Sequence, residues 1–226
     1  MPFAFKPDSP WATPLPHQAE CAATLNDPMM SDQSGIVTLP CGSGKTRIAL
    51  EQAVQCKKVL FLSYELTGVE QFKHALLTHT TVDPRHVLTL TGSSKDNPCK
   101  SICFLSTSYG ILTSMETKSG KTQSIVKNVL TSIQWDLIVC DEVHHSPANA
   151  YQHVLKTLIK NQPSSGKVLG ITATLVRKAC TADDPHTVFD FIGPVLFEKS
   201  WKQMEEAKVV SKLEFIGVST SLDAMF

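Results

Sequence analysis

Short apolar runs alternate along this chain with longer segments whose apolar residues recur every three or four positions. Short apolar runs are typical of buried strands, whereas the wider spacing is typical of helices with one buried face. The expected strands lie at 36–39, 58–63, 86–90, 102–106, 137–140, 167–171 and 212–219. The expected helices lie at 17–25, 47–54, 124–132, 146–160 and 200–208, with another that begins at 67 and includes 76.

Local signals fix several of the expected helix starts. Thr67 with Glu70, and Ser200 with Gln203, have the spacing of a capping box, in which two side chains satisfy the first backbone N–H groups. Ser146 followed by Pro147 supplies a cap and a first-turn proline. The first 16 residues hold five prolines and are expected to form an irregular lead-in.

This alternation predicts an α/β fold, a mostly parallel sheet with helices on both faces. We expect residues 17–226 to form one such domain, because 226 residues are enough to bury a substantial core. Ligands of such sheets bind at the carboxyl ends of the strands. Candidate chemistry is therefore sought where the apolar runs end.

The first such end carries a glycine-rich loop. Its residues are Pro40, Cys41, Gly42, Ser43, Gly44, Lys45 and Thr46. Between a strand and a helix, this pattern predicts a phosphate-binding loop, in which backbone N–H groups and the helix N-terminus face phosphate oxygens. Lys45 would reach the β- and γ-phosphates of ATP and Thr46 would hold Mg²⁺. Leu39 stands where the usual pattern has its first glycine, and a plain glycine-rich turn is the alternative.

A second Gly-Lys-Thr, at 120–122, lies in a polar stretch with no apolar strand before it, so we interpret it as a solvated loop.

A pair of carboxylates follows a later strand. Asp141 and Glu142 suit Mg²⁺-dependent phosphoryl transfer, with Asp141 on the metal and Glu142 on the attacking water. The alternative is a simple helix-capping feature. His144 fits a structural donor that couples the site to its surroundings, and metal binding by the nearby histidines is disfavoured.

The hydroxyls of Thr172 and Thr174 flank Ala173 at the end of the next strand, where they could bond the acidic pair and sense the γ-phosphate. An ordinary threonine-rich strand end is the alternative.

Composition narrows the setting. The formal net charge is zero, so any DNA must be held by a local patch and not by the field of the whole molecule. Seven scattered cysteines favour reduced thiols, and neither a secretory signal nor a bilayer-spanning run is evident. We expect a nuclear protein if the source is a eukaryote and a cytoplasmic one otherwise.

Together, these motifs resemble the first RecA-like domain of superfamily-2 helicases, and more closely the XPB DNA helicase family, which includes the XPB subunit of the TFIIH transcription and repair complex. The segments that carry the resemblance are 39–45, 69–73, 105–108, 141–148, 169–177, 191–198 and Trp201. The resemblance implies a RecA-like domain that uses ATP and Mg²⁺ to move along or open duplex DNA in transcription initiation and excision repair.

The same resemblance implies roles for further residues. Gln18 matches an adenine-reading glutamine, and DNA-backbone contacts are implied for Gln71, Lys73, Thr107 and Arg177. Hydroxyls and lysines are suited to phosphate contacts.

Three departures temper these expectations. Leu15, Pro16 and His17 stand where the family has an Arg and a Tyr near the glutamine, and Arg177-Lys178-Ala179 replaces an Arg-Glu-Asp linked to strand opening. No second RecA-like domain with its arginine fingers is apparent, so we expect very slow hydrolysis and weak or no unwinding by this chain alone.

Two alternatives therefore remain. One is a truncated paralogue that binds a nucleotide or a TFIIH-type partner without motor activity. The other is an unrelated phosphate-loop enzyme such as a small kinase.

Overall fold

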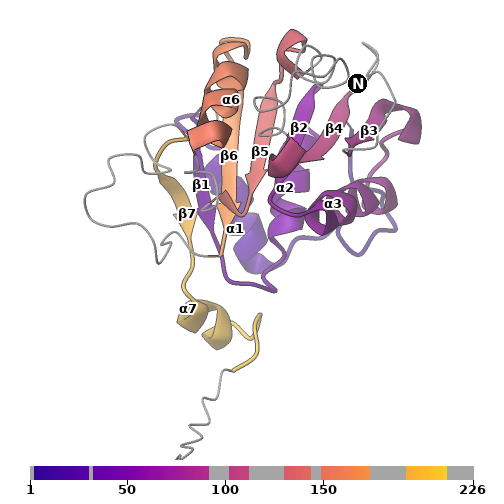
Figure 1. Ribbon diagram of the computed structural model, residues 1–226. Coiled ribbons are helices and arrows are strands. Elements are labelled where there is room, and N and C mark those ends of the chain that lie inside the picture. Colours follow the sequence, from indigo (N-terminus) through magenta and orange to yellow (C-terminus); the bar gives the residue numbers. More distant parts are fainter. Residues whose placement is uncertain are drawn as a thin grey trace, which may run out of the picture.

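A computed structural model describes residues 3–30, 33–91, 102–111, 130–143, 149–173 and 192–212 (Figure 1). Within these ranges seven strands form one sheet in the order β3-β4-β2-β5-β6-β1-β7, and every pairing is parallel. The predicted α/β fold with a mostly parallel sheet is therefore confirmed. The strands are β1 Gly35–Thr38, β2 Val59–Ser63, β3 Val87–Leu90, β4 Phe104–Ser108, β5 Leu137–Asp141, β6 Lys167–Thr172 and β7 Val195–Glu198.

Helices cover both faces of this sheet. Figure 1 shows α6 on one side, with α1 and α2 behind the strands. The helices are α1 Pro16–Leu25, α2 Lys45–Ala53, α3 Leu66–His79, α6 Asn149–Lys160 and α7 Trp201–Glu206, with a 3₁₀ turn at Pro84–His86. None of the described helices is long and apolar enough to cross a membrane.

Alternation along the strands produces two cores, because successive side chains point to opposite faces. Val37, Phe61 and Val139 pack with α1, α2 and α3. Their neighbours Leu60 and Ile138 pack with α6 on the other face. A strand buried on both sides reads as a continuous apolar run, which explains why these strands were visible in the sequence.

The lead-in has no long regular element, yet it is tied to the domain. Phe3 packs edge-on against Phe104, with ring centroids 5.2 Å apart. Trp11 stacks on His79 at the end of α3, with a centroid separation of 4.2 Å. The guanidinium of Arg47 lies 5.0 Å from the Phe5 ring centroid. The lead-in is thus a packed strap and not a loose tail.

Most element boundaries agree with expectation, and the Ser200–Gln203 capping box is confirmed. The Thr67–Glu70 capping box is wrong: α3 begins at Leu66 with Glu65 as its cap, two residues before the predicted cap, so Thr67 lies inside the first turn. The Thr67 hydroxyl donates to the Glu65 carboxylate instead (3.1 Å).

The structure also adds a strand that was not expected. This strand, β7, extends the sheet beyond β1. The helix start at 146–147, the polar loop at 120–122 and nearly all of the expected strand 212–219 lie outside the described residues.

Candidate nucleotide-binding site

The loop between β1 and α2 has the backbone shape that its glycines predict. Gly42 and Gly44 both have φ of 80°, in the left-handed region that other residues rarely adopt. The N–H of Leu39 donates to the carbonyl of Thr172 on β6 (3.0 Å), which anchors the start of the loop. The loop therefore turns over the carboxyl end of β1 and directs the chain into α2.

Polar groups of this loop suit an anion. Lys45 donates long hydrogen bonds from Nζ to the carbonyls of Leu39 (3.2 Å) and Pro40 (3.4 Å), so its ammonium lies inside the loop. The Ser43 hydroxyl is buried without a hydrogen-bond partner among the described residues. Lys45 and Thr46 form the first turn of α2, whose unpaired N–H groups favour negative charge. These groups fit a bound phosphate.

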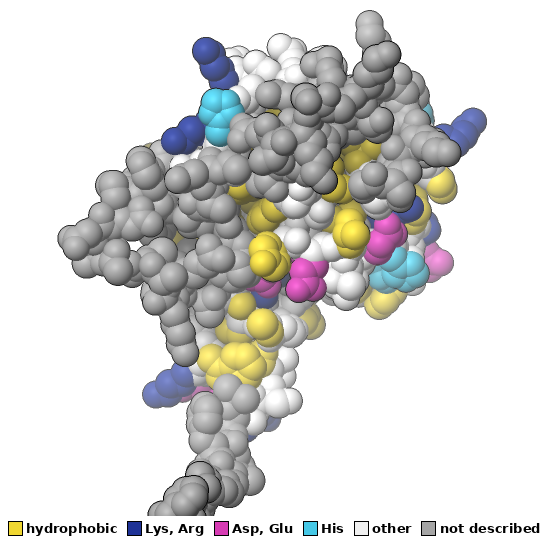
Figure 2. Space-filling model, viewed as in Figure 1, with side chains coloured by type: hydrophobic (Ala, Val, Ile, Leu, Met, Phe, Trp, Pro, Cys, Tyr) yellow, Lys and Arg dark blue, Asp and Glu magenta, His cyan; other side chains and the backbone are white. Residues whose placement is uncertain are grey.

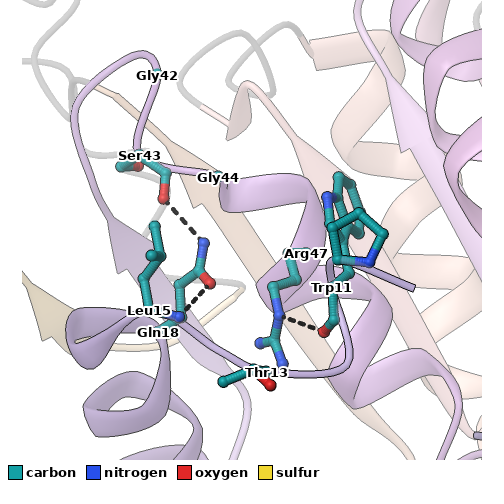
Figure 3. Close-up of a pocket in the computed structure, with 9 residues that line it drawn as sticks. Trp11, Thr13, Leu15, Gln18, Gly42, Ser43, Gly44 and Arg47 are labelled. Atoms are coloured by element: carbon teal, nitrogen blue, oxygen red, sulfur yellow. Dashed lines mark hydrogen bonds between the residues drawn. The ribbon is translucent and has the colours of Figure 1, made fainter. Parts of the chain in front are cut away.

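Gln18 holds this loop from below (Figure 3). Its side-chain Nε2 donates to the carbonyl of Ser43 (3.3 Å), and its Oε1 accepts from the N–H of Leu15 (3.0 Å). The neighbouring His17 places Nε2 2.8 Å from the same Ser43 carbonyl. Both side chains are buried, so the turn that opens α1 and the phosphate loop form one hydrogen-bonded unit.

A cavity of about 350 Å³ opens beside Gln18. It lies between the lead-in, α1 and the phosphate loop, as Figure 3 shows, and is within the size range of small-ligand sites. Arg47 from α2 borders it, with Nε donating to the Trp11 carbonyl (3.0 Å) and a guanidinium nitrogen 2.5 Å from the Glu51 carboxylate. The lining residues are Pro10, Trp11, Thr13, Leu15, Gln18, Gly42, Ser43, Gly44 and Arg47.

Asp141 ends β5 in a partly buried position. Its carboxylate accepts a hydrogen bond from the Ser63 hydroxyl at the end of β2 (3.3 Å). Burial and, to a smaller extent, the charge of Glu142 raise the pKa of Asp141 to about 6, although the hydrogen bond from Ser63 and the charge of Lys45 act in the opposite direction. Two adjacent carboxylates that are costly to ionise together favour a cation between them.

Glu142 has a backbone φ of 49°, a left-handed conformation that is strained for a residue with a side chain. Together with Asp141 it borders a second cavity, of about 400 Å³, at the start of α3. Gly68 lies close by: a Cβ added there would be 2.3 Å from the Ser63 hydroxyl and 3.4 Å from the Asp141 carboxylate. The first turn of α3 is thus packed tightly against the acidic pair.

Strand register brings these parts together. Thr38 of β1 pairs with Thr172 of β6, and Asp141 of β5 pairs with Ile171. Because β5, β6 and β1 are neighbours, the acidic pair, the Thr172–Ala173 end and the phosphate loop lie along one edge of the sheet. Thr172 is fully buried and Ala173 is partly exposed. His144 and Thr174 lie outside the described residues.

The residues expected at DNA are not brought together in the same way. Thr107 is fully buried and donates its hydroxyl to the Leu90 carbonyl (3.0 Å), so its side chain is not positioned for a DNA contact. Gln71 and Lys73 are two positions apart on α3 and point to different sides of it. Gln71 lines the cavity of the acidic pair, whereas the Lys73 ammonium lies 3.9 Å from the Glu70 carboxylate. Arg177 lies outside the described residues.

The described charged side chains form no broad basic patch in the view of Figure 2. The described lysine and arginine side chains are scattered mostly around the margins of that face, and acidic side chains lie both near its middle and at its right margin. Among the side chains that the structure describes, a DNA contact on this face would therefore rest on a few individual groups.

Sequence reasoning missed two residues of this site. Ser63 is visible as a polar residue that ends an apolar run, a signal that could have marked it as a neighbour of Asp141. Tyr109 donates its hydroxyl to the Asp141 carbonyl (2.5 Å) from the segment after β4. No sequence signal identifies that contact, because it joins two strands that are not neighbours in the sheet.

The fold and this arrangement of motifs define an ATPase domain of the superfamily-2 helicase type. A family model described as "Type III restriction enzyme, res subunit" matches residues 12–177, and the chain belongs to this ResIII family. The expected similarity to XPB is also confirmed. The XPB helicase/translocase subunit of general transcription and DNA repair factor IIH from Enterocytozoon bieneusi is 30% identical over 202 residues.

That match covers 86% of this chain and 32% of the relative, so the chain spans about a third of that protein. Solved structures share the fold. The Pyrococcus furiosus Hef helicase domain matches with a TM-score of 0.64 and 19% identity, over 85% of this chain and 39% of that one. The Sulfolobus solfataricus SWI2/SNF2 ATPase core in complex with dsDNA matches with a TM-score of 0.58 and 15% identity, over 85% of this chain and 37% of that one.

Proposed function

We propose that this chain binds ATP with Mg²⁺ at the loop between β1 and α2 and hydrolyses it as the first motor domain of an XPB-like DNA helicase or translocase. One observation supports this most directly. The phosphate loop with Lys45 follows β1 and the pair Asp141 and Glu142 ends β5, so both lie at the carboxyl edge of the same parallel sheet with only β6 between them. Phosphoryl transfer needs an anion cradle and a metal-holding carboxylate side by side.

Each group has a proposed role. Residues Pro40 to Gly44 offer backbone N–H groups to phosphate oxygens, with proline excepted because it has none. Lys45 exchanges its long bonds to loop carbonyls for the phosphates. Thr46 and Asp141 hold Mg²⁺, and Glu142 orients and deprotonates the attacking water. Bound Mg²⁺ would neutralise phosphate charge and favour the ionised form of Asp141.

Gln18 is proposed to read the adenine base in the cavity that it lines. Its amide already bonds Leu15 and Ser43, so base recognition must use its remaining hydrogen-bonding capacity. We expect ATP to bind more tightly than GTP, and Gln18→Ala to reduce that preference. Equal affinities for the two nucleotides in the native chain would reject this role.

The wider activity is proposed from the family. DNA backbone would be contacted from the Gln71–Lys73 region and Arg177, and Thr172, Ala173, Thr174 and His144 would couple that contact to the nucleotide. A second RecA-like domain, in the same chain or another, would complete the site and supply arginine fingers. Duplex opening in transcription and excision repair, TFIIH-type partners and a nuclear location in a eukaryote follow from the XPB relatives and are proposals for this chain.

The decisive experiment is ATP turnover by the purified chain with and without duplex DNA, beside Lys45→Ala. We expect slow turnover that DNA accelerates and that the variant loses. Nucleotide binding without turnover would support the second candidate, a nucleotide- or partner-binding module without motor activity. Arg177-Lys178-Ala179 in place of the family's Arg-Glu-Asp favours that candidate. A chain that neither binds nor hydrolyses ATP would reject both the motor domain and the nucleotide-binding module.

A further inference from the structure

A buried tyrosine holds the peptide group that joins Asp141 to Glu142. Tyr109 follows β4, and its hydroxyl donates to the Asp141 carbonyl at 2.5 Å. In the sheet, β2 lies between β4 and β5, so the Tyr109 side chain passes over the end of β2 to reach that carbonyl. Only 5% of Tyr109 is exposed. The contact is therefore a buried link across the carboxyl edge of the sheet.

Tyr109 is itself held by α6. Its ring packs against the Tyr151 ring with centroids 4.2 Å apart, and the Tyr151 hydroxyl lies 3.4 Å from the Cys140 sulfur. Burial raises the pKa of both tyrosines well above the usual range, so both hydroxyls stay protonated at neutral pH. Tyr109 thus remains a hydrogen-bond donor toward Asp141.

The strained backbone of Glu142 is bracketed by two contacts. On its N-terminal side, Tyr109 fixes the plane of the Asp141–Glu142 peptide. On its C-terminal side, Val143 is fully buried against Gly170, where an added Cβ would lie 3.2 Å from both Val143 methyls. The angle φ of Glu142 measures rotation about its N–Cα bond, relative to the peptide plane that Tyr109 holds. Because Glu142 is not a glycine, the surrounding structure must impose its left-handed φ.

We propose that Tyr109 is a positioning residue for Glu142. By holding the Asp141 carbonyl, it keeps the Glu142 backbone in the left-handed conformation and so sets the direction of the carboxylate toward the attacking water. This inference rests on the proposed function. Tyr109 directly follows the strand end at Thr107 and Ser108, so a displacement of that segment would be transmitted through one hydrogen bond to the hydrolytic carboxylate.

The test compares Tyr109→Phe with Tyr151→Phe, which removes the other buried hydroxyl of the ring pair, one that bonds Cys140 and Tyr109 but not Asp141. Single-turnover ATP hydrolysis with protein in excess would be measured with and without DNA, together with ATP affinity. We expect Tyr109→Phe to slow hydrolysis about tenfold with affinity kept within about twofold, because misdirected catalytic groups lose rate more than binding. Tyr151→Phe should stay near the native rate. If the native chain hydrolyses ATP, equal rates for all three proteins, or equal losses in both variants, would overturn the proposal.

A second measurement decides the case even if the native chain hydrolyses no ATP. In a crystal structure of Tyr109→Phe, we expect φ of Glu142 to leave the left-handed region, whereas Tyr151→Phe should retain it. An unchanged Glu142 conformation in Tyr109→Phe would overturn the positioning role, whatever the ATPase assays show. A native chain without ATPase activity whose Tyr109→Phe variant relaxes at Glu142 would reject the proposed hydrolysis and keep the structural role.

Discussion

The side-chain amide of Gln18 donates a hydrogen bond to the carbonyl oxygen of Ser43 at 3.3 Å, and so joins the first turn of α1 to the phosphate loop. The approach is close because the next residue is a glycine: a Cβ on Gly44 would lie 2.4 Å from the Gln18 nitrogen. The loop therefore depends on Gly44 both for its backbone angle and for room beside Gln18.

Alanine at the two loop glycines separates these effects. Gly42 and Gly44 share a φ of 80°, but a Cβ on Gly42 would meet nothing within 4 Å. Gly42→Ala should cost only the left-handed strain, about 1–2 kcal/mol of unfolding free energy. Gly44→Ala should cost about 1 kcal/mol more, because Gln18 must give up its bonds to make room. Urea unfolding would measure the two losses of unfolding free energy, and ATP titration would show the effect of each change on the loop. Equal losses in the two variants would contradict the role of Gly44 in making room for Gln18.

Glu142→Gln tests the proposed water-activating carboxylate. The amide keeps the size of the side chain and loses its basicity, so we expect ATP affinity within about twofold and hydrolysis reduced on the order of 100-fold. Nucleotide titration and single-turnover hydrolysis would measure the two effects. Native turnover in this variant would remove Glu142 from that role.

Two aspartates at opposite ends of β5 should respond in opposite directions to amide substitution. Asp141 is held beside Glu142 in a partly buried site, so Asp141→Asn should stabilise the nucleotide-free chain by about 1 kcal/mol. Asp136 accepts the backbone N–H groups of Lys57 (3.0 Å) and Lys58 (2.9 Å), so Asp136→Asn should destabilise by about 1 kcal/mol. Urea unfolding measures both changes.

The thermal midpoint with ATP and Mg²⁺ tests whether Asp141, which should destabilise the free chain, also helps to bind the nucleotide. ATP with Mg²⁺ should raise the thermal midpoint of Asp136→Asn and of the native chain but not that of Asp141→Asn. Destabilisation by Asp141→Asn without nucleotide would show that the carboxylate is not under strain in the free protein.

Part of the fold and of the candidate site could be predicted from the sequence. Strands such as β2 and β5 were predictable because both of their faces are buried, and the phosphate loop because its glycines serve its own turn. The structural role of Thr107 could not be predicted, because a hydroxyl at a strand end resembles a ligand contact. Its hydrogen bond goes to the Leu90 carbonyl on β3, and the sequence does not reveal that β3 and β4 are neighbours. The strand β7 was not predicted because it has only four residues and directly follows Gly193-Pro194, a pair typical of turns. Cross-sheet contacts such as that of Tyr109 depend on strand order, which local patterns do not encode.

Acid should loosen the lead-in from α3. His79 stacks on Trp11 and accepts or donates at Nδ1 with the Ser9 hydroxyl (3.0 Å), while burial, then His74 and Lys6, lower the pKa of His79 below 6.5. The native packing thus prefers the neutral ring. The contribution of His79 to the stability of the folded chain is therefore complete above pH 6.5 and is lost as the pH falls through its lowered pKa.

Limited proteolysis between about pH 7.5 and about pH 5.5 would measure how readily the lead-in detaches from α3. Cleavage before residue 16 should accelerate in acid for the native chain and vary less in His79→Gln. The same pH dependence in both proteins would rule out His79 as its source.

The packed strap and β7 have a practical consequence for anyone who expresses this protein or a relative. The stretch that the ResIII family model matches, residues 12–177, omits β7 and most of the strap. A recombinant fragment cut to that stretch would uncover Phe104, which Phe3 now covers, and would leave β1 as an open sheet edge ready to pair with another molecule. Such a fragment should express poorly or precipitate, because the stretch that the family model matches is shorter than the unit that folds.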